Sequence, residues 1–320
     1  MTAPTSPVRT RVLSHIGDAQ RLRLPPDLAD RVDVIPLPMS GPLPEDASGE
    51  VLLTVPGWSE HTDELVARGV RWLHFVSTGV DRVDFDRLPR GLVVTNARGA
   101  SAIPISEWVL AVMLAFEKHL PDVWIRQPPP DWRSDARLGS LHGRRLAILG
   151  FGSIGVAVAQ RALPFGMQVR GLRRTDRPSE VVGVELVASV AAAVDGADHV
   201  VVAAPLTPAT HHLIDDRALA AMKPGVHLVN IARGGLVDQD ALRVALDGGH
   251  VALASLDAVD PEPLPDGHWL FTHPRVRLSA HDSWSWPGAA AAMFDRFAVN
   301  LRAWLDDQPM PDLVDAAQGY

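Results

Sequence analysis

The sequence predicts an α/β protein of two domains, each a doubly wound parallel sheet of Rossmann-like or flavodoxin-like type, with the active site in the cleft between them. Short apolar runs of strand length alternate with helical patterns along most of the chain. This alternation is typical of parallel sheets covered by helices on both faces. With 320 residues the chain is longer than the ~100–200 residues of one ordinary domain, so two domains are expected.

Composition narrows the class of function. A hydrophobic share of 47% is enough for two cores, and a net charge of −8 without a basic block argues against a nucleic-acid partner. The chain has no cysteine, which excludes disulfides, thiolate nucleophiles and cysteine-ligated metal sites. No apolar run is long enough to span a bilayer, and residues 1–11 lack the apolar core of a signal peptide. We therefore expect a cytoplasmic protein with no membrane partner and no metal.

The first 98 residues show the strand–helix–strand alternation of a parallel sheet. A helix is predicted over 59–67, with Ser59 as its N-cap and acidic residues in its early turns. Strands are predicted at 32–35, 51–55, 72–76 and 92–95.

A long helix is predicted next, over 101–119, and it ends before Pro121. The proline run at 127–130 predicts a stiff extended connector. This connector leads into a strand over 145–149.

Three glycines follow that strand at the G-x-G-x-x-G spacing of a dinucleotide-binding turn. Gly150 permits the tight turn, Gly152 lets the backbone approach a pyrophosphate, and Gly155 lets the next helix pack closely on the strand. Ser153 and Ile154 open that helix, whose positive dipole end favours phosphate. The spacing alone is a weak signal, but the strand before it and the helix after it indicate a nucleotide site.

The rest of the chain repeats this pattern and ends in a helix over 289–304, which we expect to fold back on the first domain. Further strands are predicted at 168–172, 199–204, 227–230, 251–256 and 275–279. Polar clusters stand directly after three of these strands, where open parallel sheets bind their ligands. The clusters are 230–235, 257–263 and 280–284.

These clusters and several earlier motifs resemble the D-isomer-specific 2-hydroxyacid dehydrogenase family along most of the chain. The shared motifs are, in order, Ser77-Thr78-Gly79-Val80-Asp81, Asn96-Ala97, the glycine turn, Pro205-Leu206-Thr207-Pro208-Ala209-Thr210 and the three clusters. The resemblance points to a member similar to glyoxylate/hydroxypyruvate reductases or to phosphoglycerate dehydrogenases. It implies that Arg233, Glu262 and His281 are the catalytic residues.

The chemistry of these three side chains suits the reduction of a 2-oxo acid. The fixed fork of donors on Arg233 can orient the substrate carboxylate and carbonyl. Hydride transfer to the carbonyl carbon creates an alkoxide, so a proton donor is needed, and His281 titrates in the right range. A carboxylate at Glu262 that is bonded to this histidine would favour the protonated imidazolium.

Each catalytic residue also has a purely structural interpretation. Arg233 precedes two glycines and could be a surface turn residue, and Glu262 lies between two prolines and could simply be solvated. His281 is one of 13 histidines, most of which are structural in an ordinary protein.

The resemblance implies further binding residues, among them Asp257, for which helix capping is the alternative. The expected substrate-binding residues are Ser77, Thr78, Gly79, Arg233 and Trp284. The expected cofactor-binding residues are Gly150, Gly152, Ser153, Ile154, Gly155, Arg173, Arg174, Thr175, Pro205, Thr210, Ile231, Ala232 and Asp257.

The residues after the second strand of the cofactor domain favour NADP over NAD. NAD sites usually place an acid at that position to bond the ribose hydroxyls. Here Arg173, Arg174 and Thr175 stand there instead, and two cations suit the 2′-phosphate of NADP. The alternative is that Asp176, three residues late, supplies the missing acid.

The resemblance also implies the domain organisation. Residues 1–98 and 286–320 would form a discontinuous substrate-binding domain, and 99–285 the dinucleotide-binding domain. A segment at about 101–140 would form the interface of a homodimer, and hinge closure would exclude water from the cleft.

The expected reaction is NAD(P)H-dependent reduction of a small 2-oxo acid to a D-2-hydroxy acid. The alternatives are a non-catalytic NAD(P)-binding corepressor or sensor and a formate dehydrogenase, whose histidine pairs with glutamine.

Overall fold

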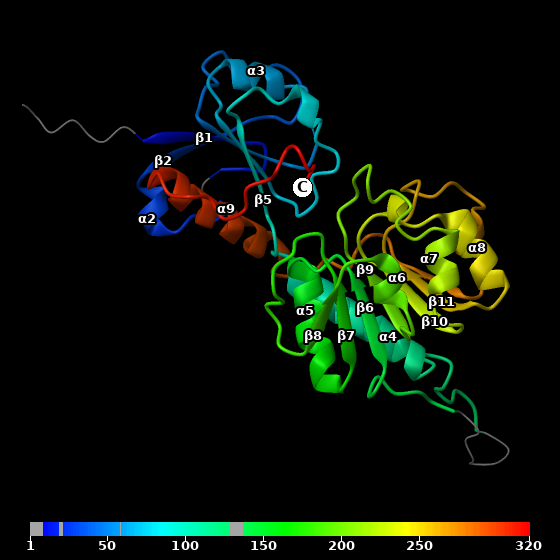
Figure 1. Ribbon diagram of the computed structural model, residues 1–320. Helices are drawn as coiled ribbons and strands as arrows, with labels where there is room; N and C mark the ends of the chain where they lie inside the picture. Colours follow the sequence, from blue (N-terminus) through cyan, green and yellow to red (C-terminus); the bar gives the residue numbers. More distant parts are fainter. Residues whose placement is uncertain (1–8, 19–21, 58, 129–136) are drawn as a thin grey trace, which may run out of the picture. The chain divides into compact units, whose positions relative to one another are not determined.

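A computed structural model describes residues 9–18, 22–57, 59–128 and 137–320 of the chain (Figure 1). The chain divides into two compact units, Met1–Ser101 with Trp286–Tyr320, and Ala102–Ser285. Each unit holds its own parallel sheet, so the α/β class predicted from the sequence is confirmed. In the described part of the chain no helix is long and apolar enough to cross a lipid bilayer.

The first unit is built on a five-stranded parallel sheet of order β2-β1-β3-β4-β5. The interior strands β3 and β4 are buried along their whole length, as in a sheet covered on both faces. The strands are β1 (Thr10–Ser14), β2 (Val32–Pro36), β3 (Val51–Thr54), β4 (Trp72–Phe75) and β5 (Val93–Asn96), and the helices are α2 (Pro26–Ala29), α3 (Thr62–Ala67), η1 (Phe85–Arg87) and α9 (Ala289–Leu305).

Helix α3 begins later than the sequence predicts. Its N-cap is His61, and Ser59 does not cap it. The Ser59 hydroxyl instead lies 2.9 Å from the Thr62 hydroxyl, and the Ser59 carbonyl accepts from the Thr62 N–H at 3.2 Å. Ser59 therefore belongs to a turn before the helix, which is what short hydroxyl side chains favour.

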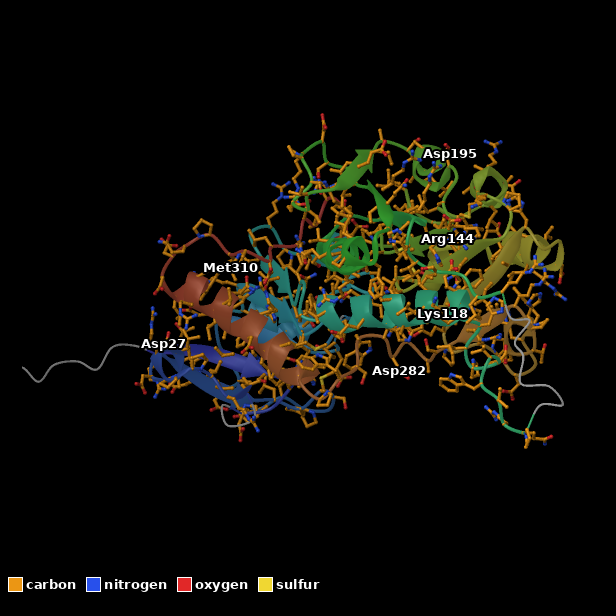
Figure 2. The ribbon with its side chains drawn as sticks, turned by 90° about the horizontal axis from the view of Figure 1, so that it is seen from below. Asp27, Lys118, Arg144, Asp195, Asp282 and Met310 are labelled. Atoms are coloured by element: carbon orange, nitrogen blue, oxygen red, sulfur yellow. The ribbon has the colours of Figure 1, made fainter. Side chains whose placement is uncertain are left out.

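Helix α9 packs on the sheet of the first unit, as the sequence predicts. Phe297 is fully buried and stacks on Trp72 with ring centroids 5.6 Å apart. Near the end of the helix, Arg302 binds Asp27 of α2 at 2.7 Å (Asp27 is labelled in Figure 2). The last helix of the chain thus completes the core that the first strands begin.

The second unit is built on a seven-stranded parallel sheet of order β12-β11-β10-β9-β6-β7-β8. Helices α4 and α5 cover one face, and α6, α7 and α8 cover the other (Figure 1). The strands are β6 (Arg145–Leu149), β7 (Gln168–Leu172), β8 (Val184–Val187), β9 (His199–Val202), β10 (Val226–Asn230), β11 (Val251–Leu256) and β12 (Val276–Leu278). The helices are α4 (Ala102–Glu117), α5 (Ser153–Ala162), η2 (Leu163–Phe165), α6 (Val190–Val194), α7 (Asp216–Ala221), η3 (Gly234–Leu236), α8 (Gln239–Asp247) and η4 (Trp269–Phe271).

The strand order of the second unit reverses at β6, whose neighbours are β7 on one side and β9 on the other. Such a switch point is where doubly wound sheets bind ligands, at the carboxyl ends of the strands. Of the predicted connector at 127–130, residues 129 and 130 lie outside the described part of the chain.

Candidate active site

The glycine turn joins β6 to α5 at the switch point and has the geometry that a dinucleotide requires. Gly150 has φ +105°, and a Cβ there would lie 2.3 Å from the Ala204 nitrogen. A Cβ on Gly155 would lie 2.5 Å from the Gly150 oxygen, whereas one on Gly152 would meet nothing within 4 Å. Gly150 and Gly155 therefore have no room for a side chain, whereas the open space beside Gly152 is available to a ligand. The residues present therefore fit a pyrophosphate at the N-terminus of α5.

The turn after β10 is organised by Asn230, for which no individual role was predicted from the sequence. Its amide nitrogen donates to the carbonyl oxygens of Arg233 at 2.9 Å and Ala258 at 3.2 Å, and its oxygen accepts from the Ala232 N–H at 3.1 Å. Asn230 is 1% exposed, so these bonds are shielded from water. They fix the backbone that carries Arg233 at the carboxyl edge of the sheet.

His281 and Glu262 come together although 19 residues separate them. Glu262 lies on the loop after β11, and His281 on the loop after β12, the neighbouring strand. The His281 Nδ1 lies 2.8 Å from Glu262 Oε1, with side chains 30% and 35% exposed. An ionised carboxylate only accepts, so Nδ1 carries the hydrogen and Nε2 is the nitrogen left for other chemistry.

Asp257 follows β11 and is 1% exposed. Its carboxylate accepts from the Ser279 hydroxyl at 2.6 Å, from the Asp282 N–H at 2.9 Å and from the Ser283 N–H at 3.1 Å. The side chain predicted to contact the cofactor thus holds the loop that carries His281.

Arg173 lies at the end of β7, where the sequence predicts contacts to a 2′-phosphate. Its side chain is 7% exposed and forms two 3.0 Å bonds to the Glu180 carboxylate. It also donates to the carbonyl oxygens of Arg177 and Pro178. Arg174 and Thr175 are exposed on the same turn. Arg173 therefore shapes the turn, and Arg174 and Thr175 present their side chains outward.

Further predicted cofactor residues follow β9 and β10, the next two strands of the sheet after β6. Thr210 folds the loop after β9 by donating to the Pro205 carbonyl at 2.7 Å and accepting from the Thr207 N–H at 2.8 Å. Ile231 and Ala232 are buried directly after β10.

The predicted substrate residues are divided between the units. In the first unit the Ser77 hydroxyl donates to the Gly79 carbonyl at 2.7 Å, and the Thr78 carbonyl accepts from Asn96 at 2.7 Å. Trp284 belongs to the second unit and is 39% exposed.

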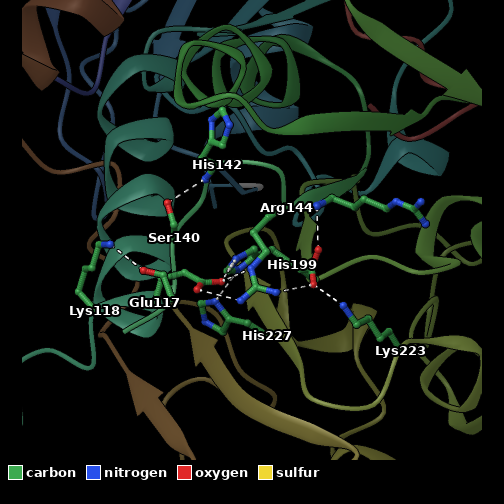
Figure 3. Close-up of polar contacts among 11 residues, drawn as sticks. Glu117, Lys118, Ser140, His142, Arg144, His199, Lys223 and His227 are labelled. Atoms are coloured by element: carbon green, nitrogen blue, oxygen red, sulfur yellow. Dashed lines mark hydrogen bonds and ion pairs between the residues drawn. The ribbon is translucent and has the colours of Figure 1, made fainter. Parts of the chain in front are cut away.

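A second polar cluster, not predicted from the sequence, lies at the opposite, amino-terminal edge of the second sheet (Figure 3). Glu117, at the end of α4, is 3% exposed and accepts from Arg144 Nε at 3.0 Å and from His199 at 3.2 Å. His199 in turn lies 3.2 Å from His227, which lies 2.9 Å from the Ser255 hydroxyl. A surface cavity of about 570 Å³ adjoins the cluster, lined by Ser140, His142, Gly143, Arg144, Arg145, Gly196, Asp198 and Lys223.

Burial and neighbouring polar groups shift the pKa values of several residues at this edge. Burial raises the pKa of the Glu117 carboxyl, but hydrogen bonds from His199 and Arg144 outweigh it, and the net pKa is lowered. Burial, helped by the neighbouring His199, lowers the pKa of His227 well below its usual value. Among the described residues, no group of three or more His, Asp or Glu side chains is arranged to hold a metal ion.

Comparisons with known proteins agree with this geometry. A family model described as "D-isomer specific 2-hydroxyacid dehydrogenase, NAD binding domain" matches residues 110–283. The D-3-phosphoglycerate dehydrogenase of Bacillus subtilis is 37% identical over 207 residues, which are 63% of this chain and 39% of that protein. The hydroxypyruvate reductase of Thermotoga maritima is 35% identical over 194 residues, 59% of this chain and 61% of that protein. The chain thus spans well under half of the phosphoglycerate dehydrogenase and less than two thirds of the reductase.

Solved structures match nearly the whole chain. A D-isomer specific 2-hydroxyacid dehydrogenase from Xanthobacter autotrophicus, in complex with NADPH and MES, has a TM-score of 0.79 at 26% identity and covers 98% of this chain and 100% of its own. An NADPH-dependent glyoxylate/hydroxypyruvate reductase from Sinorhizobium meliloti, in complex with NADP and malonate, has a TM-score of 0.74 at 25% identity and covers 97% and 98%.

Proposed function

The chain belongs to the D-isomer specific 2-hydroxyacid dehydrogenase family, and from this premise we propose that it reduces a small 2-oxo acid to the D-2-hydroxy acid with a nicotinamide cofactor. The observation that carries the proposal is the 2.8 Å bond between His281 and Glu262. It lies at the carboxyl edge of the sheet that holds the glycine turn and Arg233. A binding module without catalysis has no need of such an oriented imidazole.

We propose these roles for the chain's own residues. The cofactor, when bound, supplies the hydride. Arg233 holds the substrate carboxylate, and Ser77, Thr78 and Gly79 contribute further substrate contacts. Glu262 accepts a hydrogen bond from His281 Nδ1, which orients the imidazolium so that Nε2 gives its proton to the carbonyl oxygen. In the oxidation direction the same nitrogen takes the proton back.

The direct test is cofactor oxidation with a panel of 2-oxo acids: glyoxylate, hydroxypyruvate, pyruvate and phenylpyruvate. We expect turnover with at least one of them, and a loss of about 100-fold or more in kcat for His281→Ala, the range general acid catalysis usually contributes. His142→Ala is the matched control, because His142 is an exposed histidine at the other edge of the same sheet. Absence of turnover in the wild type, or an unchanged His281→Ala variant, would overturn the proposal.

We propose a preference for NADPH over NADH. Arg174 and Thr175 are exposed on a turn where an NAD site would carry an acid, and two neighbours of similar fold are described with NADPH or NADP. Arg174→Ser should lower the NADPH/NADH ratio of kcat/KM about tenfold, the effect of one lost charge-assisted contact. Arg217→Ser on α7 is the exposed control. A wild type that prefers NADH would refute this preference.

We also propose a homodimer formed through the segment that follows α4. Trp124, Ile125 and Leu138 are 63%, 60% and 46% exposed there, a concentration of apolar surface typical of an interface. Light scattering should give a dimer for the wild type and a monomer for Trp124→Arg, with Val244→Arg, at a 73% exposed position of α8, as control. A dimer that survives Trp124→Arg would place the interface elsewhere. A cytoplasmic location stays a prediction from the sequence.

A further inference from the structure

Asp257 is buried, ionisable and given no part in the proton transfer described above. It stands at the carboxyl end of β11, and its own N–H donates to the Asn230 carbonyl at 2.9 Å. Its carboxylate turns toward the loop that follows β12, the next strand of the sheet.

Three donors of that loop converge on the Asp257 carboxylate from both sides of His281. Before the histidine, the Ser279 hydroxyl donates at 2.6 Å. After it, the N–H groups of Asp282 and Ser283 donate at 2.9 Å and 3.1 Å. One side chain therefore ties down the chain on either side of the predicted proton donor.

The backbone of His281 needs such a tie. Its φ is +57°, in the left-handed region that a residue other than glycine rarely adopts. A left-handed residue lets the N–H groups around it point to one side and form a concave anion site. Here the anion is the Asp257 carboxylate, so the acceptor and the unusual backbone support each other. Conformations of this kind persist when their surroundings over-determine them.

We infer that Asp257 is a positioning residue that fixes the backbone of His281, while Glu262 fixes its ring. The inference rests on the proposed function, in which His281 gives the proton. A carboxylate has about four acceptor sites, and Oδ1 accepts from the Ser279 hydroxyl, the Asp282 N–H and, at 3.3 Å, the Ser283 N–H. Oδ2 accepts from the Ser283 N–H at 3.1 Å, so both oxygens of the carboxylate bond the loop.

The test combines Asp257→Asn with His281→Ala. Asparagine keeps the shape but replaces one acceptor by a donor that faces the loop N–H groups. We expect kcat to fall about 30-fold, which is about 2 kcal/mol at 1.36 kcal/mol per tenfold. The binary affinity for the cofactor should stay within about twofold. The double variant should be no slower than His281→Ala alone, because Asp257 acts through the histidine.

Two further variants keep the test interpretable. Ser279→Ala removes one of the three donors without placing a new group in the core, and a smaller loss of kcat is expected. Asp266→Asn makes the same charge change at an exposed position of the preceding loop and should leave kcat and stability unchanged.

Amide hydrogen exchange separates this inference from the proposed function. Asp257→Asn should release protection at the Asp282 and Ser283 amides even if no 2-oxo acid is ever reduced. If the wild type is inactive but the exchange changes as expected, the proposed function fails and the positioning stands. If the fold-losses of kcat from Asp257→Asn and His281→Ala multiply in the double variant, or if exchange at these amides is unchanged, the positioning role is overturned.

Discussion

Replacing Glu117 by glutamine tests whether the second polar cluster, at the amino-terminal edge of the sheet, stabilises the second unit. The change keeps the shape of the side chain and removes its charge. Glu117 is 3% exposed and accepts from Arg144 Nε, Arg144 Nη2 and His199 Nε2. In the variant an amide NH₂ would face at least one of these donors, and the charge of Arg144 would lose a partner.

The magnitude follows from the burial of the two partners. Removing one member of a buried ion pair costs about 3–5 kcal/mol. The Arg144 side chain is 38% exposed and also binds Asp198 at 3.1 Å, so water and Asp198 offset part of that cost. We expect a loss of about 2 kcal/mol, which for a unit of this size corresponds to about 4–8 °C in Tm.

The assay is thermal and denaturant unfolding, with Glu185→Gln as the matched control. Glu185 also pairs with an arginine of the second unit, Arg170, at 3.0 Å, but its side chain is 63% exposed. That exposed pair should contribute less than about 1 kcal/mol. Equal losses of unfolding free energy in the two variants would refute the argument that burial makes the Glu117 ion pair more stabilising than the exposed one.

The pH dependence gives a second check on the same carboxylate. Its pKa is lowered in the folded protein, so its contribution is present above the ordinary value of 4.5 and is lost as the pH falls through the folded value. The difference between wild type and Glu117→Gln should therefore be largest near neutral pH and shrink in acid. A difference that does not shrink in acid would show that packing, rather than charge, separates the variants.

Three further predictions concern other parts of the second unit. The pKa of His227 is lowered well below 6.5, so the free energy of unfolding should fall as the pH drops below 6.5. His227→Gln should reduce the slope of unfolding free energy against pH by about 1.36 kcal/mol per pH unit, the contribution of one proton. An unchanged slope would contradict this. Gly152→Ala should leave Tm almost unchanged but weaken cofactor binding, measured by calorimetry. Gly150→Ala should lower both Tm and cofactor affinity, because its Cβ would lie 2.3 Å from backbone. Equal Tm values for the two variants would contradict this geometry. Glu262→Gln should lower kcat about 100-fold with little change in cofactor affinity, measured by steady-state kinetics, and an unaltered kcat would remove Glu262 from the mechanism.

The strands were predictable wherever they are continuous apolar runs. The run at Val251–Leu256 is predicted to the residue, since five of its six residues are apolar, as is typical of strands in a covered parallel sheet. The strands β1 and β8 were missed. β1 follows a stretch rich in Pro, Thr and Ser and contains Arg11, although Val12 and Leu13 are completely buried. β8 is a short, partly exposed edge strand, which leaves little periodicity to detect.

The geometry of the site was less predictable than its residues. His281 and Glu262 meet because β11 and β12 are neighbours, and strand order is a property of the whole sheet. The left-handed backbone of His281 could not be predicted from the sequence, since the position is not occupied by glycine, the residue that usually adopts this conformation. In the same way two adjacent arginines predicted a phosphate site, but the binding of Arg173 to Glu180 depends on how the chain returns after the turn.

Asn230 and Asp257 suggest a common reason for polar residues at the ends of buried strands. Both are 1% exposed, and both use their side chains to bond backbone groups of loops that carry predicted catalytic residues. A buried amide or carboxylate is costly unless every acceptor and donor finds a partner, so each enforces one loop conformation. The same sequence position can therefore look like a ligand contact and act as a scaffold. The double variant of Asp257 and His281 separates those two roles, because a scaffold has no effect once the residue it holds is gone.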